Sequence, residues 1–213
     1  MASFSLRRAP VTRSLIIANL AVFIAVALAI GIDRAGLMGG LIPGRLSGAV
    51  VLTGALPPAA TIVSSAFLHA GPLHLAMNML FLAWVGRLLE PPLGAERFAG
   101  LYALALVAAA ATQFLAGPAS PHPVVGASGA IAGLFGAHAL IQAMAGRYQR
   151  QLPTRPWTEA GRLLLVWTLF QLALGLVAGA GGLGIAIWAH IGGFAAGLAW
   201  VLARLRPAPQ ASG

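Results

Sequence analysis

The chain has 213 residues, of which 59% are hydrophobic and 8% are charged, and its formal net charge is +9. Soluble domains carry about 25% charged residues, so this composition excludes a water-soluble globule and indicates a protein that is embedded in a lipid bilayer. The absence of cysteine excludes disulfides and thiolate metal sites. All of the positive charge comes from thirteen arginines, which in a membrane protein indicate topology and contact with anionic lipids rather than with nucleic acid.

Six apolar segments are long enough to cross a bilayer, which requires about 20 residues. They are residues 14–32, 73–89, 98–116, 126–145, 162–180 and 184–205. The stretch 33–72 is too apolar for a solvated linker and too interrupted by Gly and Pro for a span. We expect it to form a long first loop in the membrane interface, with short helical pieces. The predicted fold is an all-α membrane protein, with one six-span domain at 14–205 between tails at 1–13 and 206–213.

The arginines orient the predicted spans, because cytoplasmic loops of membrane proteins are enriched in positive charge. When the spans alternate in direction, eleven arginines fall on one side: Arg7, Arg8, Arg13, Arg87, Arg97, Arg147, Arg150, Arg155, Arg162, Arg204 and Arg206. The other two, Arg34 and Arg45, fall on the opposite side. We therefore expect both termini to be cytoplasmic, and we expect the first span to be retained rather than cleaved as a signal peptide.

Polar side chains at membrane depth are costly and are candidates for function. Four of them fall in the second, fourth and sixth spans, all of which begin on the outer side: His74, Asn78, Ser128 and His190. At about 1.5 Å per residue, each lies within about 9 Å of the outer end of its span. Three helices that run in the same direction thus bring Ser, His, His and Asn to one layer near the outer face.

These residue types fit nucleophilic catalysis. A serine hydroxyl needs a base to take its proton, and His190 is the candidate base for Ser128. A carboxylate usually orients such a histidine, but none of the four acids is placed to reach His190: Asp33, Glu90, Glu96 and Glu159. If the chain is a hydrolase, the sequence therefore predicts a Ser–His dyad. His74, Asn78 and the backbone N–H of Ser128 could donate hydrogen bonds to a developing oxyanion.

Glycines could allow the serine and the histidine to meet. Gly129 and Gly133 form a small-residue face on the fourth span, and Gly193 and Gly197 form another on the sixth. Such faces let helix backbones approach closely. His190 lies on the second face, because Gly193 follows it by three residues. Gln113 and Gln171 are interpreted as contacts within the bundle, and His69 as a residue that is structural or lies near the site.

Three segments resemble the rhomboid intramembrane serine proteases: SSAFLHAGPLHLAMNMLFLAWVGRLLE at 64–90, GASGAIAGLFGA at 126–137 and AHIGGFAAG at 189–197. The resemblance implies six spans, a cytoplasmic N-terminus in bacterial forms and a membrane-lying first loop. It implies that Ser128, in the motif that begins at Gly126, is the nucleophile and that His190 is the base. His74 and Asn78 then match a pair that helps to hold the oxyanion, and Glu90 matches a structural acid near the inner end of the second span.

The sequence departs from that family's pattern in two places. Many members carry a Trp-Arg pair in the first loop, where this chain has Ala60 and Thr61. Many also carry an aromatic residue four positions after the serine, which packs on the histidine, and here that position is Ala132. Another side chain must therefore hold the imidazole of His190, or the imidazole is held less firmly.

The predicted function is that of an intramembrane serine endopeptidase in a bacterial inner membrane. It would cleave other membrane proteins in or near their transmembrane segments, close to the outer face. Its expected partners are such substrates and membrane lipids, with no cofactor, metal or nucleic acid, and the sequence assigns no oligomeric state. Glycines before the sixth span could form a flexible gate: Gly179, Gly181, Gly182 and Gly184. The alternatives are an inactive rhomboid-like protein that binds transmembrane helices and, third, a small transporter or channel.

Overall fold

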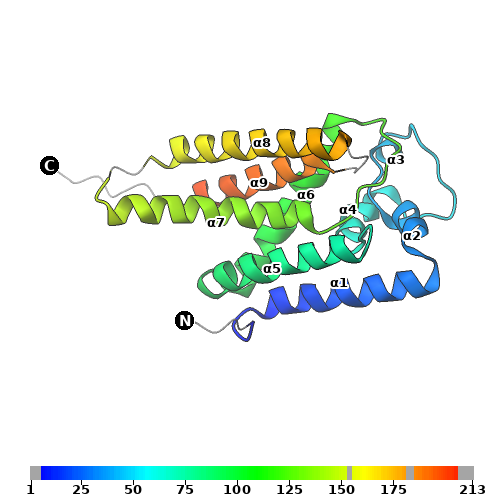
Figure 1. Cartoon of the computed structure of the whole chain (residues 1–213), viewed down its shortest axis with the longest axis horizontal. Helices are drawn as coiled ribbons and strands as arrows, with labels where there is room; N and C mark the ends of the chain where they lie inside the picture. The colour runs from blue at the N-terminus through cyan, green and yellow to red at the C-terminus, as the bar shows by residue number, and fades with distance from the viewer. Residues whose placement is uncertain (1–5, 153–154, 181–184, 206–213) are drawn as a thin grey trace.

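The structure is a computed structural model, which describes residues 6–152, 155–180 and 185–205. Its long helices are α1 (Pro10–Ala29), α5 (Pro72–Leu93), α6 (Ala95–Ala116), α7 (Ser128–Gln149), α8 (Pro156–Ala180) and α9 (Ile187–Leu202). Successive long helices run in opposite directions, so α1 begins and α9 ends at the same end of the bundle (Figure 1). The predicted all-α bundle is confirmed.

Five of the long helices, α1, α5, α6, α7 and α8, are long and apolar enough to cross a membrane. The last helix, α9, has 16 residues, which corresponds to about 24 Å at 1.5 Å per residue and is shorter than a typical span. It begins and ends three residues inside the predicted segment 184–205. Because α9 packs chiefly against α7 and α6, much of its surface faces protein rather than lipid.

The first loop contains five short helical pieces: α2 (Ile32–Gly39), α3 (Pro43–Leu46), η1 (Pro58–Ala60), α4 (Thr61–Ser64) and η2 (Ser65–Phe67). These pieces gather at the end of the bundle where α5, α7 and α9 begin (Figure 1). Arg45 Nη2 donates a 2.7 Å hydrogen bond to the carbonyl of Leu56 across this loop. Ala60 is exposed, whereas Thr61 is buried and donates to the carbonyl of Pro58. The arginine that forms this hydrogen bond across the loop is thus Arg45 of α3, and position 61 is a threonine.

The opposite end of the bundle holds α1 against α5 through Glu90. The carboxylate accepts hydrogen bonds from the backbone N–H groups of Val11 and Thr12, at 2.7 and 2.8 Å, and from the Thr12 hydroxyl at 2.7 Å. Free N–H groups in the first turn of a helix favour an anion. The side chain of Thr12 also fills the space above Gly86. Glu90 is buried, and the groups that donate these hydrogen bonds to it belong to the first turn of α1.

The same end of the bundle carries most of the positive charge. Ten of the eleven arginines that were predicted on one side are described, and each lies at the beginning of α1, α6 or α8, at the end of α5, α7 or α9, or in a segment that adjoins one of these helix ends. Glu159 binds both Arg147 and Arg162, the latter at 2.9 Å. The two remaining arginines, Arg34 in α2 and Arg45 in α3, lie in the first loop.

Candidate active site

Ser128 is the first residue of α7, and the first loop positions the chain that leads to it. An isolated antiparallel bridge joins Leu41 to Val124, and the N–H of Gly126 donates a 2.8 Å hydrogen bond to the carbonyl of Ser65. Gly126 has a φ of +116°, a conformation that L side chains rarely adopt. The glycine in front of the serine therefore lets the loop turn sharply into α7.

His190 is the fourth residue of α9, and its ring meets the serine. The distance between His190 Nε2 and Ser128 Oγ is 2.8 Å. One turn further on, the backbones of α7 and α9 touch: a Cβ on Gly193 would lie 2.9 Å from the carbonyl carbon of Gly129. A Cβ on Gly197 would likewise lie 2.8 Å from the carbonyl carbon of Gly133. Only glycines permit this approach, which brings the two side chains within hydrogen-bond distance.

The far side of the imidazole faces α8. His190 Nδ1 lies 3.0 Å from Oε1 of Gln171, a residue that is 2% exposed. The indole Nε1 of Trp167 donates to the carbonyl of His190 at 3.2 Å. From the sequence alone, Gln171 is interpreted as a bundle contact. The available signal was that Gln171 is the only amide in the segment 162–180, although nothing in the sequence shows which helix it faces.

His74 lies beside the serine, whereas Asn78 is turned towards its own helix. A Cβ on Gly126 would meet His74 Nε2 at 3.0 Å and Ser128 Oγ at 3.7 Å, so both residues flank this glycine. Asn78 Nδ2 donates to the carbonyl of His74 at 2.9 Å, and Asn78 Oδ1 is buried without a partner among the described residues. The structure therefore brings together Ser128, His190 and His74, and it leaves Asn78 one helical turn away.

His69 packs under His74, just before α5. The two ring centroids are 5.2 Å apart with the rings edge to face, and His69 is 2% exposed. Burial, helped by the nearby His74, lowers the pKa of His69 to about 4. His69 is therefore neutral at physiological pH, and its ring packs against the ring of His74.

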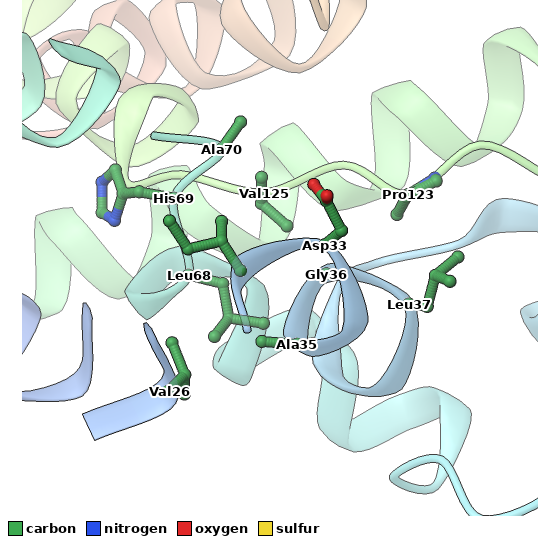
Figure 2. A pocket seen from close by; sticks show the side chains of 11 residues that line it. Val26, Asp33, Ala35, Gly36, Leu37, Leu68, His69, Ala70, Pro123 and Val125 are labelled. Atoms are coloured by element: carbon green, nitrogen blue, oxygen red, sulfur yellow. The ribbon is translucent and has the colours of Figure 1, made fainter. Parts of the chain in front are cut away.

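A cavity of about 340 Å³ lies next to this histidine pair, between α2 and the segments around 69 and 124. Figure 2 shows Asp33 in its wall, with the imidazole of His69 pointing away from that carboxylate. Neither Ser128 nor His190 lines this cavity. Asp33 thus belongs to the first loop, while Glu90 and Glu159 are bound at the opposite end of the bundle.

The glycines that were predicted to form a gate lie at the end of α8 and in the segment that follows it. The predicted gate glycines Gly181, Gly182 and Gly184 lie outside the described residues, and Gly179 belongs to the last turn of α8. Ala132 is buried in α7. On the side of the His190 ring away from Ser128, the ring contacts Gln171 of α8. No cluster of three or more metal-binding side chains occurs in the part of the chain that the structure describes.

The chain was compared with known protein families and curated proteins. The family model described as "Rhomboid domain" matches residues 58–207, which includes α5 to α9 and the end of the first loop. RHOMBOID-like protein 5 of Arabidopsis thaliana is 37% identical over 76 residues, covering 36% of this chain and 25% of that protein. The match therefore spans about a quarter of this relative's length. Because the family model covers well over half of the sequence, the chain belongs to the rhomboid family and is an integral, multi-pass membrane protein.

Proposed function

We propose that the chain is an intramembrane serine endopeptidase, which hydrolyses a peptide bond in or near the transmembrane segment of another membrane protein. The observation that carries this proposal is the 2.8 Å approach of His190 Nε2 to Ser128 Oγ. A serine hydroxyl and an imidazole at hydrogen-bond distance can act as the nucleophile and the general base of acyl transfer. Both side chains come from long apolar helices of a multi-pass membrane protein.

In the first half of the reaction, Ser128 Oγ attacks the carbonyl carbon of the substrate while His190 Nε2 takes the hydroxyl proton. The tetrahedral intermediate then expels the amine, and the same nitrogen returns the proton to that leaving group. In the second half, a water molecule gives a proton to His190 and attacks the acyl-enzyme. The serine leaves with that proton, and a carboxylic acid is released. These steps transfer only protons and an acyl group, so the proposal includes no cofactor and no metal.

The start of α7 offers donors for the negative charge that develops on the substrate oxygen. Ser128 is the first residue of that helix, and N–H groups of a first turn have no partner within the helix. His74, beside Ser128 across Gly126, is the second donor in this proposal. Asn78 would join them only after its amide turns away from the carbonyl of His74. Such donors contribute most where water is excluded.

The position of the dyad supports a substrate that is itself a membrane segment. Ser128 and His190 lie in the first turns of α7 and α9, at the bundle end opposite most arginines. In this proposal the protein lies in a bacterial inner membrane with its arginine-rich end on the cytoplasmic side. Both termini are then cytoplasmic, and the site lies near the outer face. A substrate helix must unwind locally before its carbonyl reaches Ser128, because helical backbone is hydrogen-bonded and shielded.

The test is cleavage of a single-span substrate by the purified full-length chain in detergent. Wild type should cleave, and Ser128→Ala and His190→Ala should each lower kcat by about 10,000-fold or more. The matched control is His122→Ala, which changes an exposed histidine in the loop before α7 and should leave the rate unchanged. Cleavage that survives in Ser128→Ala would contradict the proposal. An inactive wild type that still binds transmembrane helices would favour the helix-binding alternative.

A further inference from the structure

The amide of Gln171 is the polar group in contact with His190 on the side away from the serine. It lies in the middle of α8, where the two adjacent side chains, Phe170 and Leu172, are exposed. Gln171 itself is 2% exposed, and its Oε1 is 3.0 Å from His190 Nδ1. An amide in an apolar span is costly unless it is paired. The partner of this amide is the candidate catalytic base.

A second contact from the same face of α8 fixes the backbone of the histidine. Trp167 precedes Gln171 by four residues, so the two side chains lie on one side of the helix. Its indole donates to the carbonyl of His190 at 3.2 Å and stacks on Phe194, with ring centroids 4.6 Å apart. Helix α8 therefore contacts His190 at the main chain and at the ring.

The chemistry of an amide oxygen decides which ring nitrogen carries the proton. Oε1 can only accept a hydrogen bond, so a bond to Nδ1 requires a proton on Nδ1. In a neutral imidazole the other nitrogen, Nε2, then carries the lone pair, and Nε2 is the atom that faces Ser128 Oγ. The contact with Gln171 thus favours the tautomer in which His190 can act as a base.

We propose that Gln171 is a positioning residue, which holds the ring of His190 in the tautomer and orientation that deprotonate Ser128. This inference rests on the proposed protease function and extends it from a pair of residues to three. A neutral amide takes the place that a carboxylate has in a Ser-His-Asp arrangement. The amide orients the imidazole without placing the negative charge of a carboxylate in the apolar interior.

Gln113, a second glutamine that contacts α9, provides a matched control. Gln113 Oε1 accepts a hydrogen bond from the backbone N–H of Ala189 at 3.2 Å, so this contact is to the main chain of α9, one residue before His190. Replacing either glutamine by methionine keeps the approximate shape and removes the hydrogen bond. A purely structural role predicts the same outcome for both variants, whereas a positioning role predicts different outcomes.

The first readout is the kinetics of wild type, Gln171→Met, Gln171→Glu and Gln113→Met on one transmembrane substrate. We expect Gln171→Met to lower kcat about tenfold, the effect of one lost hydrogen bond, with KM unchanged. Gln171→Glu should restore kcat, because a carboxylate oxygen also accepts from Nδ1. Gln113→Met should lower only Tm. Equal losses of kcat in the two methionine variants, or no rescue by glutamate, would overturn the proposal.

The second readout separates this inference from the protease function. Nitrogen-15 spectra of protein with labelled histidine side chains distinguish protonated from unprotonated ring nitrogens, and the chain has only five histidines. His190 should carry its proton on Nδ1 in wild type and shift towards the Nε2–H tautomer in Gln171→Met. An unchanged tautomer would overturn the inference. If wild type cleaves nothing, the protease proposal fails, but the spectra still decide whether Gln171 sets the tautomer.

Discussion

Helices α7 and α8 both contact α9 close to His190, but they do so by different means. Half of the apolar stretch of α7 is buried in the protein, against 11% for α8. The α7–α9 contact is made by backbone at Gly129, Gly133, Gly193 and Gly197, whereas the α8–α9 contact near the site is made by the side chains of Trp167 and Gln171. The glycines thus set the distance between α7 and α9, and the polar side chains of α8 set the orientation of the His190 ring.

The largest effect should come from filling the glycine contact. Gly193→Ala would push a methyl group into the backbone of Gly129, so we expect the free energy of unfolding to fall by about 3 kcal/mol and kcat to fall with it. Gly100→Ala is the matched control, because a Cβ there meets nothing within 4 Å. Thermal unfolding and cleavage assays on both variants would test this. Equal stability of the two variants would contradict the role of the close approach.

A contact far from the site should affect stability without affecting catalysis. Glu90→Gln removes a charged acceptor of three hydrogen bonds at the α1–α5 contact, so we expect a loss of about 2 kcal/mol in the free energy of unfolding. The kcat of the folded fraction should not change. The control is Glu96→Gln at an exposed position in the first turn of α6. A specific loss of kcat in Glu90→Gln would show that the two ends of the bundle are coupled.

A third contact, between His69 and His74, should make stability depend on pH. Unfolded histidine titrates near 6.5, whereas burial lowers the pKa of folded His69 to about 4. The unfolded chain therefore binds more protons between these values, and stability that is present above pH 6.5 is lost as the pH falls. From pH 7 to 5.5, wild type should lose about 1 kcal/mol more than His69→Phe. Parallel pH profiles of Tm for the two proteins would contradict this assignment.

The smallest effect should come from the backbone contact of α8. Trp167→Phe keeps an aromatic ring against Phe194 but removes the donor to the His190 carbonyl. We expect a loss of about 0.5 kcal/mol and about a twofold lower kcat. Trp157→Phe, at an exposed position on the same helix, is the control and should match wild type. A larger loss than that of Gly193→Ala would reverse the comparison between α7 and α8.

The helices could be predicted from the sequence because a bilayer demands long apolar segments, but their ends could not. Helix α8 begins at Pro156, six residues before the predicted span at 162, since its polar first turns are stabilised by ion pairs between Glu159 and arginines rather than by lipid. Helix α5 continues to Leu93 through two prolines, beyond the predicted end at residue 89. Hydropathy detects the membrane, not the extent of a helix outside it.

A residue of the candidate site could be predicted from the sequence where the direction of its helix and its depth in the membrane were enough to locate it. Ser128, His190 and His74 could be placed in one layer because their spans run in the same direction, and the glycine spacing indicated which faces meet. Gln171 could not be assigned, because its span runs the opposite way and the sequence does not reveal the rotation of α8 relative to α9. The departure at Ala132 indicated that another side chain holds the ring of His190 or that the ring is held less firmly, but it did not point to Gln171.

The most direct test of the central claim is where a serine-directed fluorophosphonate attaches to the chain. The wild type should form one adduct, which mass spectrometry of its peptides places on Ser128, because His190 activates that hydroxyl. His190→Ala should form none under the same conditions. A wild type that stays unlabelled, an adduct on another residue, or equal labelling of His190→Ala would contradict the account of Ser128 and His190 as a catalytic pair.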